Sequence, residues 1–171
     1  MNAGEKKSDS ILNELKRRRA GEKIVDVEEE TVKIVIFTLL GDYYAFHGED
    51  IKEILHVSNI FYVPGSPDFI PGIINIRGDI ESVININGFL GLSDSVQTDK
   101  SRIVVASRGG VKSGIRVDSV EDVSDMPVSS VKPALSTLRA EIGDLVAGEL
   151  ICMDKNVTLL DVGKIFAKIA S

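Results

Sequence analysis

The sequence has one cysteine and no long apolar run, and each of these features excludes a class of protein. The single Cys152 excludes an internal disulfide and is typical of a protein in a reducing cytosol. No apolar run approaches the ~18 residues of a membrane span, so we expect no direct membrane insertion. The N-terminus also lacks the hydrophobic segment of a secretory signal. These features together indicate a cytoplasmic protein.

Aromatic residues and positive charge are scarce as well. Tryptophan is absent, there are only three Tyr and six Phe, and the net charge is −6. Stacking on bases needs aromatic rings and phosphate binding needs a basic surface, so we expect no nucleic acid partner. The 171 residues, 43% of them hydrophobic, suit one domain or two very small ones.

The first 31 residues form a charged N-terminal extension, and residues 32–171 form the domain that follows. The extension carries a basic run, Lys16–Arg19, and Asp9 or Ser10 is placed to cap a short helix through Glu22. Few apolar residues accompany this helix, so a flexible, solvated segment is the preferred interpretation. The alternative is a basic amphipathic helix that lies on a membrane or a partner.

Strands are predicted where the domain begins. Apolar residues fill both faces of Thr31–Leu39, a turn follows at Gly41, and Tyr43–His47 makes a second strand, which together predict a hairpin. In Glu49–His56 the apolar residues recur at helical intervals instead. That spacing predicts a short helix or helical turn.

The clearest pattern in the chain lies in the stretch PGIINIRGDIESVININGFLGL, residues 71–92. Isoleucines alternate with polar residues on both sides of Gly78, namely Ile74, Ile76, Ile80, Ile84 and Ile86. Alternation at period two predicts strands with one buried face. Because Gly78 takes positive φ without steric cost, we predict a hairpin turn at Arg77-Gly78-Asp79. Arg77 would then stand at the exposed end of the hairpin, beside Asn75.

The sequence also contains a weak internal repeat. A shift of 69 residues aligns Gly41 with Gly110, and a shift of 76 residues aligns Gly72 with Gly148. We predict two β units, at about residues 34–92 and 103–168, each with a hairpin, a helical turn, a proline loop, a hairpin and a short helix. Each unit is small for independent stability, so the two should pack together. Whether the chain crosses between them is left open.

The two copies differ most around the predicted turn. Residues 75–78, Asn-Ile-Arg-Gly, align with residues 151–154, Ile-Cys-Met-Asp. A residue that only the fold requires would be expected in both copies, but Arg77 aligns with Met153. The asymmetry favours a functional role for Arg77 over that of a solvated turn residue.

Reactive side chains do not assemble into a recognisable catalytic set. Glu53 and His56 have a spacing found at metal sites on helices, but one such pair supplies too few ligands. Cys152 aligns with Ile76, which the alternation places in the core, so a structural thiol is expected. The glycine-rich stretch at 109–114 lacks the residue order of a phosphate loop. We therefore predict no enzyme, no cofactor and no metal.

Several stretches together resemble the CheW family of chemotaxis coupling proteins. They are FTLLGDYYAFHGEDIKEIL, VPGSPDFIPGIINIRGDI, GIRVDSVEDV and TLLDVGKIF, and they span about residues 31–168. The most specific part is the motif G-x-x-N-x-R-G at residues 72–78. The resemblance implies a mainly β fold of two pseudo-repeated, SH3-like five-stranded barrels packed together, with short helices. The chain departs from the family at Ser82 and Asn85, where proline and aspartate are usual.

The resemblance also implies a function and a site. It implies a non-enzymatic adaptor that couples the cytoplasmic tips of methyl-accepting chemoreceptors to the regulatory domain of a CheA-type histidine kinase, in arrays at the inner membrane face. Receptor contact is expected around a groove where the barrels meet, at Ile51, Glu53, Ile54, Asn75, Arg77 and Gly78. Kinase contact is expected on the outer surface of the first barrel. The alternatives are an adaptor of a paralogous motility or developmental pathway, and a β-barrel that binds a small molecule in a closed cavity between its units.

Overall fold

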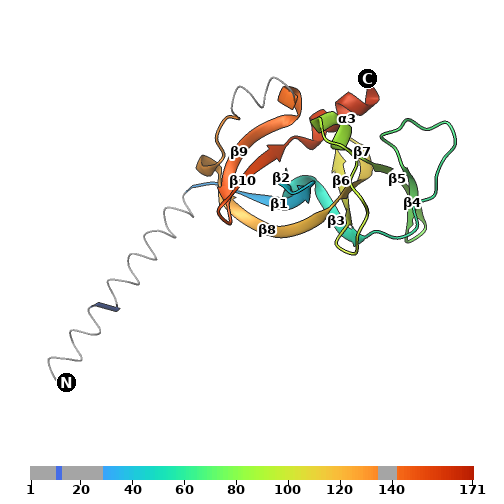
Figure 1. Cartoon of the computed structure of the whole chain (residues 1–171). Helices are drawn as coiled ribbons and strands as arrows, with labels where there is room; N and C mark the ends of the chain where they lie inside the picture. The colour runs from blue at the N-terminus through green and yellow to red at the C-terminus, as the bar shows by residue number, and fades with distance from the viewer. Residues whose placement is uncertain (1–10, 13–28, 135–141) are drawn as a thin grey trace.

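The computed structural model describes residues 11–12, 29–134 and 142–171, whose strands form two five-stranded sheets (Figure 1). The first sheet runs in the order β8 (Ser119–Pro127), β1 (Thr31–Leu39), β2 (Asp42–His47), β10 (Lys155–Leu160) and β9 (Val146–Cys152). The second runs in the order β3 (Ile51–His56), β6 (Arg102–Arg108), β7 (Val111–Val117), β5 (Asp79–Ile84) and β4 (Gly72–Ile76). Short helical elements lie between strands or at the C-terminus: η1 (Gly48–Asp50), η2 (Asn87–Leu90), η3 (Val128–Ser130), η4 (Gly143–Leu145) and α3 (Val162–Ala170). The predicted mainly β, two-barrel SH3-like fold is confirmed.

The two sheets are pseudo-equivalent. Strands β1 to β5 each have a counterpart five strands later, in β6 to β10. When every strand is replaced by its counterpart, the order β8–β1–β2–β10–β9 becomes β3–β6–β7–β5–β4, which is the order of the other sheet. The 76-residue shift maps β5 onto β10 residue for residue. Each sheet nevertheless combines strands from both halves of the chain. The sheets therefore do not coincide with the predicted units 34–92 and 103–168, because the chain crosses between sheets at η1 and again between β7 and β8.

Three clusters of buried side chains hold the structure together. Each barrel has its own small core, around Ile36 and Leu159 in the first and around Ile74 and Ile103 in the second. A larger cluster, which includes Phe37, fills the space between the sheets and continues into α3. In some strands, successive side chains point alternately into a barrel core and into this central core. Such strands are therefore apolar on both faces. The central core also occupies the space where a small-molecule cavity between the units was considered.

The segment predicted to be helical, Glu49–His56, is mostly a strand. Only η1 precedes it, and β3 pairs with β6 from Ile51 to His56. A β-bulge explains the misleading pattern, because Ile51 lies opposite Ala106 and Ile54 opposite Val104, with one extra residue between. The bulge brings Ile51 and Ile54 to one face at a spacing of three, which imitates a helix. The corresponding helical turn of the second copy is likewise a strand, β8.

The hairpin of β4 and β5 differs from its prediction in two details. Its turn contains only Arg77 and Gly78, because Ile76 pairs directly with Asp79. Ile80, predicted to be buried, is 60% exposed, since it lies opposite Asn75 near the tip, beyond the reach of the central core. Asn85 and Asn87, predicted to face solvent, are buried.

Of the N-terminal extension, the structure describes only Ile11, Leu12 and residues 29–31. The predicted helix from Asp9 to Glu22 therefore lies outside the described residues, apart from positions 11 and 12. The described end of the extension contacts the first barrel. The backbone N–H of Val128 donates to the carbonyl of Glu30 at 2.9 Å, and that of Ser129 donates to the Glu29 carboxylate at 3.1 Å. The folded domain thus begins no later than Glu29.

Candidate functional site

The tip of the β4–β5 hairpin is a rigid two-residue turn. Arg77 has φ of 51° and Gly78 has φ of 92°, and two consecutive positive φ angles match the twist of a tight hairpin. The side-chain oxygen of Asn75 accepts a hydrogen bond from the Gly78 N–H at 2.8 Å. Three of the predicted site residues therefore form one local structure, which fixes the point from which the Arg77 side chain leaves the backbone.

The equivalent turn in the first barrel has the same backbone with different side chains. Met153 and Asp154, between β9 and β10, have φ of 53° and 59°. The fold therefore requires two left-handed residues at this turn but does not require arginine. Arg77 adopts a left-handed conformation that non-glycine residues seldom take, as Met153 and Asp154 do in the other turn, so the backbone alone does not distinguish arginine from other residues here.

The Arg77 side chain crosses to the neighbouring edge strand. Its Nη2 lies 2.5 Å from Oε2 of Glu53 on β3, and the two side chains are 72% and 26% exposed. The pKa of Arg77 is raised, first by this hydrogen bond and then by the charge of Glu53. Since exposed ion pairs contribute little to stability, the contact matters more for holding the guanidinium in place. Among the described residues, no hydrogen bond engages the other N–H donors of the guanidinium, which leaves them available to a partner.

Gly72, the first residue of the motif, is required by a close backbone approach. The loop after β3 pairs with β4 through two hydrogen bonds between Phe61 and Ile73, of 2.8 and 2.9 Å. A Cβ atom on Gly72 would lie 2.3 Å from the carbonyl oxygen of Phe61, which no side-chain rotation could relieve. Gly148 is crowded in the same way by Lys132 in the first barrel. The two glycines that the repeat aligns thus have the same structural role.

Strand β3 supplies the remaining predicted residues. Ile54 is 37% exposed on the face that β3 shares with Val104, whereas Ile51 is half-buried and packs against the central core. Glu53 points to the opposite face, toward Arg77. The structure therefore brings Glu53, Asn75, Arg77 and Gly78 together, leaves Ile54 exposed on the opposite face of β3, and makes Ile51 mainly a packing residue.

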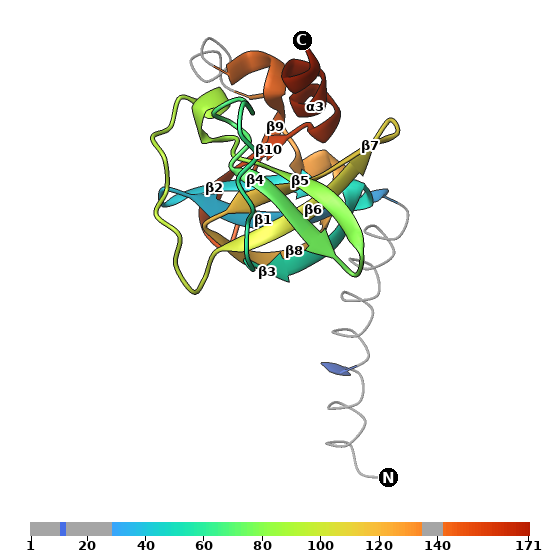
Figure 2. The same cartoon turned by 90° about the vertical axis from the view of Figure 1, so that its right-hand side faces the viewer.

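Exposed apolar residues that the sequence analysis did not select lie on neighbouring elements. Val123 on β8, the counterpart of Ile54 under the 69-residue shift, is 48% exposed, and both views place β3 and β8 along the same edge of the molecule (Figures 1 and 2). The repeat alignment could have identified Val123, because it aligns this residue with Ile54. Phe61 and Tyr62 are also exposed, but they lie in an irregular loop, where periodicity gives no information.

The two departures from the family pattern are each matched by a local partner. The Ser82 hydroxyl shares a hydrogen bond of 2.8 Å with that of the buried Ser113. The Asn85 amide donates to Asp94 at 2.9 Å, and its oxygen accepts the N–H of Asn87 at 2.9 Å. Asn85 therefore secures the loop that follows η2, and Asp94 supplies a carboxylate to that network.

The other candidate reactive groups do not converge. Because β3 is a strand, Glu53 and His56 point to opposite faces instead of sharing a helical face. Within the described ranges, no group of three or more His, Cys, Asp or Glu side chains is arranged to hold a metal ion. Cys152 is half-buried and packs against the core of the first barrel. Among these same residues, no helix is long and apolar enough to cross a bilayer.

Comparison with known proteins gives a consistent result. Residues 33–170 match the CheW-like domain family. The chemotaxis protein CheW of Bacillus subtilis is 30% identical over 60% of this chain and 65% of its own length, and that of Thermotoga maritima is 30% identical over 80% and 89%. Protein PilI of Pseudomonas aeruginosa is 26% identical over 66% and 63%. The crystal structure of the scaffolding protein TtCheW from Thermoanaerobacter tengcongensis aligns with a TM-score of 0.69 and 30% identity, over 78% of this chain and 86% of that one.

Proposed function

The chain belongs to the CheW-like family of chemotaxis adaptors, and from this premise we propose that it couples methyl-accepting chemoreceptors to a CheA-type histidine kinase. The observation that carries the proposal is the Arg77–Glu53 pair at the tip of the β4–β5 hairpin. An exposed arginine held by a second side chain is presented to solvent, and the pseudo-equivalent turn shows that the fold does not need it.

The receptor surface in this proposal consists of Glu53, Ile54, Asn75, Arg77 and Gly78, with Ile51 supporting it from below. The planar guanidinium of Arg77 would hydrogen-bond a carbonyl or carboxylate at the tip of the receptor's helical hairpin. The exposed Ile54 would bury its side chain against the same helices. A surface of one charged anchor and a neighbouring apolar residue suits a helical partner that ends in polar groups.

The sequence analysis expected kinase contact on the outer surface of the first unit, residues 34–92; because each sheet combines strands of both units, we now propose this contact on the barrel formed by β1, β2, β8, β9 and β10. The regulatory domain of the kinase is expected to share the barrel fold, so the contact would join barrel to barrel. The receptor surface lies on the second barrel, at β3 and the β4–β5 turn. Because the two surfaces belong to different barrels, one molecule can hold both partners, which is what an adaptor requires.

The protein acts, in this proposal, without catalysis and on the cytoplasmic side of the inner membrane, where the receptor tips lie. A small-molecule role is disfavoured because the buried side chains of the central core fill the space between the barrels. An adaptor of a paralogous pathway stays a second candidate. It is favoured by the likeness to PilI and by the replacement of the family's usual proline and aspartate with Ser82 and Asn85.

The two partner contacts are tested separately. Purified protein is titrated against a soluble fragment of a receptor tip and, independently, against the isolated regulatory domain of the kinase from the same cell. Saturable binding to both is expected. Binding to neither would contradict the adaptor proposal, and binding only to receptors of a motility or developmental system would favour the paralogous pathway.

A further inference from the structure

Strand β8 presents an acidic outer surface around one apolar side chain. It is an edge strand of the first sheet, and its exposed residues are Glu121, Val123 and Asp125. Glu121 accepts a hydrogen bond of 2.7 Å from the Ser119 hydroxyl. Asp125 lies opposite Lys33 of β1, but the two side chains form no ion pair. Within the described part of the chain, no cation therefore pairs with either carboxylate, and Val123 is 48% exposed between them.

The fold does not require acidic residues at these positions. In the pseudo-equivalent edge strand β3, the 69-residue shift places Lys52 and His56 where β8 has its two exposed carboxylates. Both side chains are exposed, and the exposed Ile54 lies between them. The same strand position therefore accepts either charge, so the acidic surface of β8 is specific to that strand.

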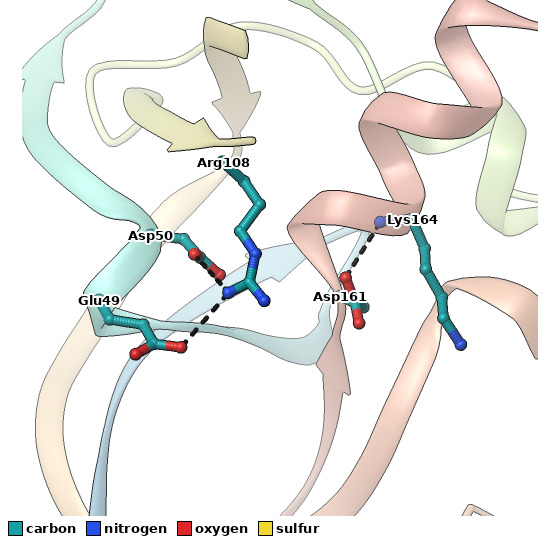
Figure 3. Close-up of polar contacts among 5 residues, drawn as sticks. All are labelled: Glu49, Asp50, Arg108, Asp161 and Lys164. Carbon is teal, nitrogen blue, oxygen red and sulfur yellow. Dashed lines mark hydrogen bonds and ion pairs between the residues drawn. The ribbon is translucent and has the colours of Figure 1, made fainter. Parts of the chain in front are cut away.

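The carboxylates in and beside β3 are paired within the fold, unlike those of β8. The Arg108 guanidinium lies 3.1 Å from the Asp50 carboxylate and 3.4 Å from that of Glu49, at η1 (Figure 3). Arg77 pairs with Glu53 on the strand itself. A surface of like charges around an exposed apolar residue, with no such internal cation, suits a basic partner that carries an apolar neighbour.

The N-terminal extension supplies such a partner within the same chain. Its basic run, Lys16–Arg19, follows Leu15 and lies outside the described residues. The extension joins the domain beside the end of β8, because the first residue of β1 pairs with the last residue of β8 (Figure 1). Arg19 and Glu29 are ten residues apart, a length of chain that spans up to about 35 Å. The nine residues of β8 span about 30 Å, so the basic run can reach every position of the strand.

We propose that the Lys16–Arg19 run docks on β8 of its own domain, where it pairs with Glu121 and Asp125 and covers Val123. Each exposed ion pair contributes little, so docking depends on several pairs together and weakens as salt screens them. The tether offsets this weakness, because it keeps the run at an effective concentration of about a millimolar.

Docking has a consequence for the partner surface. Strands β3 and β8 lie along the same edge of the molecule, so a docked run competes with a partner helix for that edge (Figures 1 and 2). The competition rests on the function proposed above, whereas the docking concerns the free protein.

Paramagnetic broadening of amide signals in the full-length free protein tests the docking. A nitroxide is attached to Ala20→Cys in a Cys152→Ser background, so that the chain has one labelled thiol. Amides 121–125 should broaden more than those of the β4–β5 hairpin, independently of dilution. The difference should disappear in about 1 M salt, where the screening length is about 3 Å. Broadening that arises only between labelled and unlabelled molecules would assign the contact to a second copy and overturn the proposal.

Variants matched in net charge give the decisive comparison, because a tethered label samples β8 even without docking. Arg18→Gln/Arg19→Gln should reduce the broadening of amides 121–125 by about twofold or more, since half of the basic run is lost. Lys6→Gln/Lys7→Gln should leave it nearly unchanged. On the strand, Glu121→Gln/Asp125→Asn should act like the arginine variant, with the exposed carboxylates of Asp68→Asn/Asp99→Asn as the control. Equal broadening in the matched variants would overturn the proposal.

Receptor binding provides the second readout. Because docking leaves the edge only partly available, Arg18→Gln/Arg19→Gln should bind the receptor fragment about two- to fivefold more tightly than wild type. Loss of docking with unchanged receptor affinity would overturn the competition. If the wild-type protein itself binds no receptor fragment, the proposed function fails, while the broadening of β8 still decides the docking.

Discussion

Replacing Arg77 should separate receptor binding from stability. The side chain is 72% exposed and its only ion pair among the described residues is with Glu53. Exposed substitutions usually change the free energy of unfolding by less than about 0.5 kcal/mol. In a domain of this size that corresponds to about 1–2 °C in melting temperature. Arg77→Ala should therefore melt within this range of wild type.

The backbone of the turn allows a sharper form of the experiment. Glycine adopts φ near 51° without strain, so Arg77→Gly should melt at or slightly above Arg77→Ala. Loss of a charge-assisted contact at the centre of an interface weakens binding by about tenfold or more. Both variants should therefore lose receptor affinity by at least that factor, although one of them relieves backbone strain. Arg77→Lys should recover only part of the affinity.

The assay is calorimetric titration of each variant with a receptor-tip fragment, with kinase-domain binding and a thermal melt on the same samples. Lys112→Ala is the matched control, because Lys112 is an exposed cation on the same sheet and pairs with Glu81 at 3.4 Å. Kinase binding should be unchanged throughout. Equal receptor affinity for wild type and Arg77→Gly would refute the site, and a drop of many degrees for Arg77→Ala would make Arg77 a structural residue.

Three further predictions concern the framework around the site. Gly72→Ala should lower the melting temperature by roughly 3–10 °C, because its Cβ would clash with the Phe61 carbonyl; an unchanged melt would show that the loop moves freely. Burial, assisted by the charge of Asp42, raises the pKa of Tyr44 to about 12, so the folded protein keeps its proton while the unfolded chain loses it near pH 10. Stability contributed by Tyr44 is therefore full below pH 10 and is lost between about pH 10 and 12, and chemical denaturation should show a flatter profile there for Tyr44→Phe than for wild type. Asn85→Asp should cost about 1 kcal/mol at pH 7 by setting a second carboxylate against Asp94, and Asp94→Asn in the same chain should restore it; equal stability of the single and double variants would contradict this.

The sequence predicted the architecture well because its repeat and its turns are local signals. Gly41 and Gly110 both have positive φ at hairpin turns, and Gly72 and Gly148 both admit a neighbouring backbone. Such requirements leave the same residue in both copies. The exchange of strands between the barrels gives no comparable signal in the sequence. A strand that follows the crossover at η1 is apolar whichever half of the chain supplies its neighbours in the sheet.

The errors came from features that periodicity does not encode. The bulge in β3 gave Ile51 and Ile54 a helical spacing, and only its pairing with β6 reveals the strand. Ile80 follows the buried alternation but lies too far along the hairpin to be covered. The partnership of Arg77 with Glu53 joins residues 24 positions apart, so the sequence identified both without indicating that they touch.

The central claim is that one molecule bridges a receptor and a kinase through two separate surfaces. Its most direct test is sedimentation of receptor-tip assemblies with the full-length kinase, in the presence and absence of this protein. Kinase should sediment with the receptors only when the wild-type protein is added, and Arg77→Gly should leave the kinase in the supernatant while still binding it in solution. Equal recovery of kinase in the pellet with and without the protein would contradict the account.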